Sequence, residues 1–150
     1  MRKIIRFIDI PPSWLLFFMG AGWGLDEIAP LGLVAPTPIV GGVVMACGVV
    51  LAVWAALVFR RSKTPVFPRR RPEALVRSGP YAVSRNPIYV ADLVILLGWS
   101  AAIGSAWPAF LTPLFMLILQ KRFIDGEEAA LREGFPEEWE DWSAKTRRWL

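Results

Sequence analysis

The chain contains no histidine and a single cysteine, Cys47. Without histidine it lacks the commonest transition-metal ligand and the usual general base. One cysteine can form neither an intrachain disulfide nor a thiolate metal cluster. These absences count against a zinc enzyme, a haem protein and a Ser-His hydrolase, and the sequence predicts no metal site.

Charge is also scarce, since 20% of the 150 residues are charged and 55% are hydrophobic. A helix that crosses a bilayer needs about 20 mostly apolar residues. We therefore expect an all-α, polytopic membrane protein that forms a single domain, 1–150, with about four transmembrane helices. The predicted spans are 13–29, 39–59, 88–106 and 107–120. The first is the weakest, because Asp26 and Glu27 lie near its end.

Basic residues cluster at the N-terminus and between the second and third spans, whereas the first connection carries only acids. The positive-inside rule then places both termini and the 60–86 loop in the cytoplasm, and we expect a bacterial inner membrane. The net charge of +4 indicates topology and attraction to anionic lipid rather than nucleic-acid binding. The basic residues are Arg2, Lys3, Arg6, Arg60, Arg61, Lys63, Arg69, Arg70, Arg71, Arg77 and Arg85.

A signal peptide is an alternative interpretation of the N-terminus, because Met1-Arg2-Lys3 fits a basic leader region. Asp9 and the Pro11-Pro12 pair interrupt the apolar run that would follow. The sequence therefore favours a retained N-terminal segment.

The segment 77–89, RSGPYAVSRNPIY, is basic, rich in turn residues and continuous with the third span. Gly79-Pro80 predicts a turn, and Pro87 fits the first turn of a helix. Tyr81, Arg85, Asn86 and Tyr89 would thus gather at a membrane surface, which suits the binding of a polar cofactor beside lipid. The alternative is an Arg85 that anchors the span and tyrosines that belong to the interfacial aromatic belt.

The short 104–105 connection predicts a tight hairpin of the third and fourth spans, which returns the chain to the cytoplasmic face. The loop and the C-terminal tail should then meet, with Glu127 and Glu128 opposite Arg85. A carboxylate can bind an ammonium or ribose hydroxyls, and an arginine can bind a carboxylate. The set would match a zwitterionic amino-acid group, unless the two acids are ordinary solvated helix charges.

The tail also carries an amphipathic pattern. Gly134 fits a helix end and Pro136 a new helix start. Apolar residues spaced by four, four and three form one face flanked by charge, namely Leu131, Phe135, Trp139 and Trp142. This spacing predicts a C-terminal helix that lies on the membrane interface.

Asp92 lies within the third predicted span, three residues after Tyr89 and seven after Arg85, so the three share a helix face. An ionisable residue inside a span is a functional candidate by default. The alternative is a shallow carboxylate that pairs with a loop arginine.

Loop and tail together resemble the membrane methyltransferases of the isoprenylcysteine carboxyl methyltransferase and phospholipid methyltransferase type. In that family a G-[P/I]-Y-x-x-x-R-[H/N]-P-x-Y segment opens a membrane helix, and a hairpin, a paired E-E and an aromatic-basic tail follow. The match covers about 75–149, and we expect the catalytic half at about 75–150. The matching residues are Gly79, Pro80, Tyr81, Arg85, Pro87, Tyr89, Glu127, Glu128, Arg132, Phe135, Trp139, Trp142 and Arg147.

The resemblance implies S-adenosylmethionine as methyl donor and a lipid-like acceptor that enters from the membrane. Asn86 stands where the isoprenylcysteine enzymes carry histidine, and Asp92 replaces a usually small or apolar residue. The cofactor-binding residues it implies are Tyr81, Arg85, Asn86, Pro87, Tyr89, Glu127 and Glu128, and the catalytic candidates are Asp92, Tyr89 and Glu128.

Asp92 could orient an ammonium or accept its proton, which slightly favours an amine headgroup, such as that of phosphatidylethanolamine, over a carboxyl or thiol. The alternative from another class is a non-enzymatic four-helix membrane protein, either a small transporter or an assembly factor.

Overall fold

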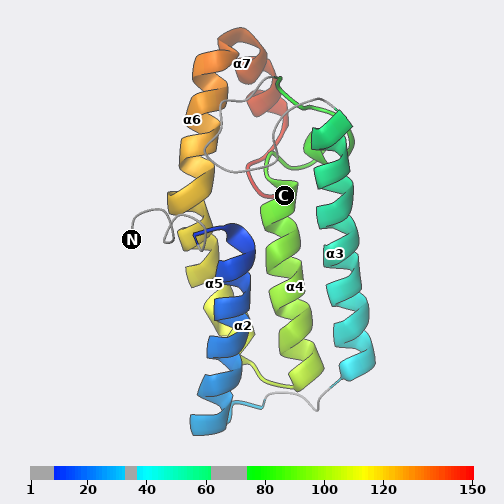
Figure 1. Ribbon diagram of the computed structural model, residues 1–150, viewed down its shortest axis with the longest axis vertical. Coiled ribbons are helices and arrows are strands. Elements are labelled where there is room, and N and C mark those ends of the chain that lie inside the picture. The colour runs from blue at the N-terminus through cyan, green and yellow to red at the C-terminus, as the bar shows by residue number, and fades with distance from the viewer. Residues whose placement is uncertain (1–8, 33–36, 62–73) are drawn as a thin grey trace. The chain divides into compact units, whose positions relative to one another are not determined.

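The computed structural model describes residues 9–32, 37–61 and 74–150. Within these ranges every named element is helical, which confirms the all-α prediction, and Ser84 and Arg147 form an isolated β-bridge. The elements are α2 (Pro11–Ile28), α3 (Pro38–Arg61), a 3₁₀ turn (Gly79–Ala82), α4 (Pro87–Ile103), α5 (Trp107–Leu119), a π-helical segment (Gln120–Ile124), α6 (Asp125–Gly134) and α7 (Pro136–Lys145) (Figure 1).

Proline opens four of these helices, at Pro11, Pro38, Pro87 and Pro136. Its fixed φ suits the first helical turn, where a backbone N–H would have no intrahelical partner. The helices therefore begin close to the predicted positions, and α6 ends at Gly134 as expected.

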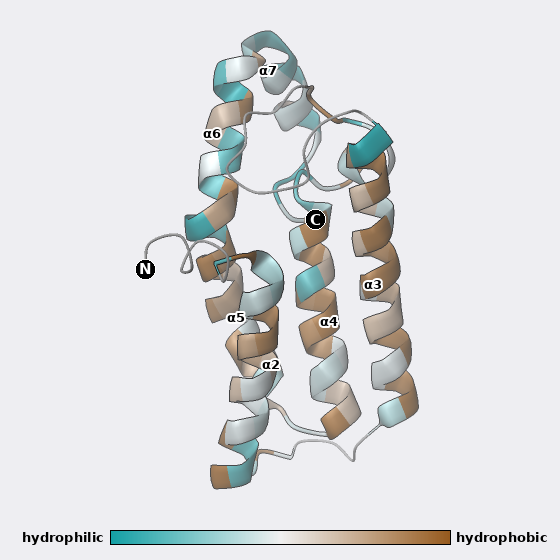
Figure 2. Cartoon of the chain, in the orientation of Figure 1, coloured by the Kyte–Doolittle hydropathy of each residue, from teal (hydrophilic) through white to brown (hydrophobic). Residues whose placement is uncertain are grey.

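Among the described helices, α3 is the one that is long and apolar enough to cross a membrane. Its 24 residues span about 36 Å at 1.5 Å per residue, against a hydrocarbon core of about 30 Å. Figure 2 shows α3 hydrophobic over most of its length, with the basic pair Arg60 and Arg61 in its last turn. α4 is a shorter apolar helix. Four crossings remain a prediction.

The described residues belong to two compact units, one of residues 1–49 and 91–118 and the other of residues 50–90 and 119–150. In the first, close backbone packing joins α3 and α4. A Cβ added at Gly41 would lie 2.4 Å from the Ala102 nitrogen, and one at Gly98 would lie 2.8 Å from the Met45 nitrogen. Small residues let membrane helices approach this closely.

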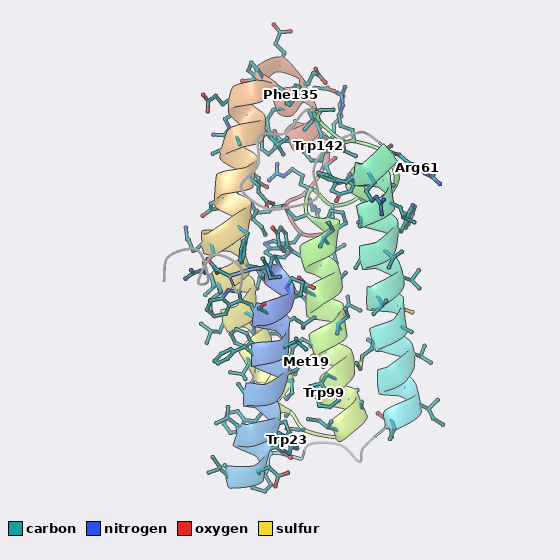
Figure 3. All side chains as sticks on the ribbon, in the orientation of Figure 1. Met19, Trp23, Arg61, Trp99, Phe135 and Trp142 are labelled. Atoms are coloured by element: carbon teal, nitrogen blue, oxygen red, sulfur yellow. The ribbon has the colours of Figure 1, made fainter. Side chains whose placement is uncertain are left out.

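The first unit also packs α2 against α4 and α5. The Trp99 indole donates a 3.2 Å hydrogen bond to the Met19 carbonyl, and Figure 3 shows the two residues next to each other. The rings of Phe18 and Phe115 lie 4.9 Å apart. Gly104, with φ of 71°, turns the chain between α4 and α5, which confirms the tight hairpin.

In the second unit the tail tryptophans form part of the core. Trp139 and Trp142 are 3% and 5% exposed and pack with Ala55, Val76 and Tyr81. The expectation that these tryptophans face the membrane interface is wrong. The end of α3 and the segment before the 3₁₀ turn provide an apolar protein surface that covers them.

Several sequence-based expectations fall outside the described residues. They concern basic residues that set the predicted orientation, namely Arg2, Lys3, Arg6, Lys63, Arg69, Arg70 and Arg71. The orientation of the chain and its organisation as one domain also remain predictions.

Candidate functional site

The 3₁₀ turn positions Tyr81. Gly79 has φ of 61°, and a Cβ there would lie 3.2 Å from Val58, so glycine suits both the conformation and the space. Tyr81 is 4% exposed, and its ring lies 4.8 Å from that of Phe59. Burial raises the pKa of Tyr81 well above its ordinary value, with a further contribution from the Glu127 charge. Tyr81 is therefore a neutral core residue at physiological pH.

The chain after Tyr81 is attached to the C-terminal tail. The Trp142 indole donates to the Tyr81 carbonyl over 3.0 Å, and the Arg85 N–H donates to the Arg147 carbonyl over 2.9 Å. The Asn86 side-chain amide donates to the Arg148 carbonyl over 3.1 Å. The structure thus brings loop and tail together, as the hairpin argument predicted.

Glu128 of α6 lies at the centre of this junction and is 5% exposed. Its Oε1 is 3.2 Å from the Arg85 Nε and 3.3 Å from the Asn86 side-chain nitrogen. Its Oε2 accepts a short hydrogen bond from the Arg148 guanidinium. A buried carboxylate needs such compensation, because desolvation penalises its charge. Glu128 is therefore a buried acceptor and not a solvated helix charge.

Arg85 is fixed from several sides. Its guanidinium lies over the Trp139 ring, 5.4 Å from the centroid, and donates to the Ser143 carbonyl over 3.3 Å. Its buried Nε is close to Glu128 but makes no hydrogen bond to any described residue. Buried donors rarely remain unpaired in native proteins. A ligand oxygen at this position would satisfy the donor.

A second polar pair connects α4 with α6. The Tyr89 hydroxyl donates to Glu127 Oε1 over 2.9 Å, and the Tyr89 ring stacks on Phe123 with centroids 6.2 Å apart. Phe123 belongs to the π-helical segment that precedes α6, and such segments often occur at functional sites. Pro87, at the start of α4, is fully buried.

Asp92 belongs to the other compact unit, although it lies on α4 only three residues after Tyr89. It is 6% exposed, and its buried Oδ2 has no hydrogen-bond partner among the described residues. The pairing of Asp92 with a loop arginine stays a prediction, because Arg69, Arg70 and Arg71 lie outside the described residues. Its part in a common site with Tyr89 and Glu128 remains a prediction.

Arg148 is the residue that the sequence did not single out. Its guanidinium binds both Glu128 and Asp125, with 3.1 Å to the Asp125 Oδ1. The hydrogen bond to Glu128 is the largest cause of a raised Arg148 pKa. The sequence did contain a signal for this contact. Asp125 and Glu128 are three residues apart, so they share a helix face and can bind one cation.

Comparison with known proteins identifies the family to which the chain belongs. The family model described as phospholipid methyltransferase matches residues 36–138, more than half of the chain, and covers both the loop and the Glu127-Glu128 pair. The chain belongs to the phospholipid methyltransferase family. The family's description names methyl transfer to phospholipid.

Three curated proteins are similar over part of the chain. The nickel-cobalt-cadmium resistance protein NccN of Alcaligenes xylosoxydans xylosoxydans is 31% identical over 51% of this chain and 36% of its own length. The cobalt-zinc-cadmium resistance protein CzcN of Cupriavidus metallidurans is 34% identical over 45% and 32%. An uncharacterised protein of Haemophilus influenzae is 32% identical over 42% of this chain and 100% of its own length.

The chain thus spans about a third of the length of the two resistance proteins. No solved structure matches it significantly. Among residues 9–32, 37–61 and 74–150, no group of three or more His, Cys, Asp or Glu side chains could hold a metal ion.

Proposed function

We propose that this family member transfers the methyl group of S-adenosylmethionine to a lipid-like amphiphile at the cytoplasmic face of the membrane. The observation that carries the proposal is the buried Glu128 carboxylate, which lies between Arg85, Asn86 and Arg148. A site with carboxylate and guanidinium groups side by side suits a ligand that carries an ammonium and a carboxylate.

The residues present fit this cofactor. The Arg85 Nε, which lies 3.2 Å from Glu128 but makes no hydrogen bond to any described residue, offers a donor for a carboxylate oxygen. Glu128 or Glu127 can accept from an amine or from ribose hydroxyls. Asn86, Pro87 and Tyr89 would line the site. When bound, the cofactor supplies a methyl group that its sulfonium already activates. The protein then has to bind and orient the reactants and exclude water, and orientation alone can contribute about 7–11 kcal/mol.

We propose that the acceptor is an amine headgroup, such as that of phosphatidylethanolamine, rather than a carboxyl or thiol group. A protonated amine has to lose a proton before its nitrogen can attack a methyl group. Asp92, a buried acid one turn beyond Tyr89 on α4, can orient an ammonium and accept its proton.

The isosteric change Asp92→Asn tests this assignment. It should lower turnover on an amine lipid by roughly 10²-fold or more, the usual scale of general acid–base catalysis, and leave cofactor binding intact. Unchanged turnover on the amine lipid would remove the argument for an amine acceptor and leave carboxyl and thiol acceptors as the candidates.

We further propose four crossings of a bacterial inner membrane with both termini in the cytoplasm. Exposed Glu27 and Glu133 would then lie on opposite sides. In a Cys47→Ser background, an impermeant maleimide added to spheroplasts should label Glu27→Cys and spare Glu133→Cys. Labelling of both positions, or of Glu133→Cys alone, would contradict the proposed topology.

Cofactor binding separates the enzyme from a small transporter or an assembly factor. S-adenosylhomocysteine should raise the melting temperature of the purified protein in lipid nanodiscs, whereas adenosine should not. A ligand that binds only the folded state adds about 2.7 kcal/mol at 100 times its Kd. No shift at millimolar S-adenosylhomocysteine would favour the non-enzymatic alternative.

A further inference from the structure

Residues 146–148, which follow α7, form a C-terminal strap beside Glu128. Thr146 is buried and extended, with φ of −120° and ψ of 126°. The carbonyls of Arg147 and Arg148 accept hydrogen bonds from Arg85 and Asn86. The strap is thus attached through its backbone to the loop that supplies the other proposed cofactor-binding residues.

The two arginines on Glu128 differ in their freedom. The Arg85 side chain is 15% exposed and is also bound to Trp139 and Ser143. The Arg148 side chain is 32% exposed and makes only side-chain ion pairs within the described ranges, with Glu128 and Asp125. Arg148 is therefore the guanidinium that can leave Glu128 without disturbing the core.

The compensation of charges around Glu128 indicates which ligand could replace Arg148 there. Glu128 pairs with Arg85 and Arg148, and Asp125 pairs with Arg148 and with the exposed Lys121. An ammonium that binds Glu128 has to displace one of its two arginines, and the displaced, partly buried guanidinium would be stabilised by a new anion. A ligand carboxylate would provide it, so a zwitterion can enter by exchange of ion pairs with no net charge left uncompensated.

We propose that Arg148 binds the carboxylate of the cofactor's amino-acid group and exchanges its Glu128 ion pair for it when the ammonium binds Glu128. The inference rests on the proposed function and adds a binding residue that the sequence motifs do not contain. It makes the C-terminal strap part of cofactor recognition, because the same residue links the strap to the ligand.

Two ligands and two matched variants test the proposal. S-adenosylhomocysteine carries the amino-acid group, whereas 5′-methylthioadenosine keeps the adenosine and the thioether and lacks that group. Arg148→Gln should weaken S-adenosylhomocysteine binding by about tenfold or more and leave 5′-methylthioadenosine binding unchanged, measured by titration calorimetry in nanodiscs. Arg147→Gln removes the same charge from an exposed neighbour and should leave both affinities unchanged.

Other results overturn the proposal. Equal weakening of both ligands would make Arg148 a structural residue, and tighter S-adenosylhomocysteine binding would make it a competitor for Glu128. If Arg148→Gln does not fold, Arg148→Lys keeps the charge without the planar fork, and the same selective loss, though smaller, is expected. Failure of the unaltered protein to bind S-adenosylhomocysteine would instead contradict the proposed function itself.

Discussion

The two compact units are stabilised in different ways. In the unit of residues 1–49 and 91–118, helices approach through glycine, and large apolar side chains such as Leu16, Phe17 and Phe110 remain exposed. In the unit of residues 50–90 and 119–150, tryptophans fill a core and a carboxylate is buried between two arginines.

We propose that the difference follows from the surroundings, with the first unit in lipid and the part of the second unit beyond α3 in contact with water. Lipid tails are as apolar as leucine, so helices in a membrane gain stability from close packing rather than from burying apolar surface. A unit in contact with water gains from burying aromatic residues and can support a satisfied polar network. The buried Glu128 and the two arginines around it belong to the second unit.

The largest effect should come from breaking the polar network at Glu128. Glu128→Gln leaves Arg85 and Arg148 without their shared anion and should cost about 3–5 kcal/mol of stability, together with cofactor binding. Glu133→Gln, an exposed acid on the same helix, is the matched control and should change little. Similar melting temperatures for the two variants would show that the network does not stabilise this unit.

The next effect tests the glycine packing of the other unit. Gly41→Ala places a Cβ 2.4 Å from the Ala102 nitrogen and should destabilise the protein by about 1–3 kcal/mol. Gly42→Ala, one residue along α3, has no atom within 4 Å of its added Cβ and should be neutral or stabilising. Detergent melts of the pair check this, and equal shifts would mean that α3 and α4 do not pack so closely.

Much of the fold could be predicted because the residues that start helices and form turns act locally. Proline starts four helices, and the Gly104 turn makes the hairpin that brings loop and tail together. The position of Glu128 near Arg85 followed from that hairpin and the family resemblance. The helix starts depend on a few neighbouring residues, so they can be predicted without knowledge of the tertiary packing.

The tail could not be predicted in the same way. An apolar stripe with Trp139 and Trp142 fits a lipid surface and a protein core equally well, and only the partner surface decides. Arg147 and Arg148 are adjacent and chemically alike. Arg148 reaches Glu128 whereas Arg147 is exposed, and this difference depends on the path of the backbone after α7, which no local sequence pattern fixes.

A smaller effect on stability should distinguish the hydroxyl groups of the two tyrosines in the second unit. Tyr89→Phe removes the hydrogen bond to Glu127 and should cost about 0.5–1.5 kcal/mol. Tyr81→Phe keeps the ring contact with Phe59 and the carbonyl bond from Trp142, so its melting temperature should change less. If Tyr81→Phe lowers the melting temperature more than Tyr89→Phe does, the hydroxyl of Tyr81 in the core contributes more stability than the bond from Tyr89 to Glu127.

The smallest effect should come from the ion pair of Arg77 and Glu138, whose nearest atoms lie 3.1 Å apart and whose side chains are 44% and 51% exposed. Water screens such a pair, so a double-mutant cycle with Arg77→Gln and Glu138→Gln should give a coupling of about 0.2–1 kcal/mol. The coupling should disappear in 1 M salt, where the Debye length is about 3 Å. The cycle of Arg85→Gln and Glu128→Gln should keep its coupling in the same salt, because the buried pair is shielded from ions. Equal salt sensitivity would mean that ions reach Glu128, and the contrast between an exposed and a buried ion pair within this unit would no longer hold.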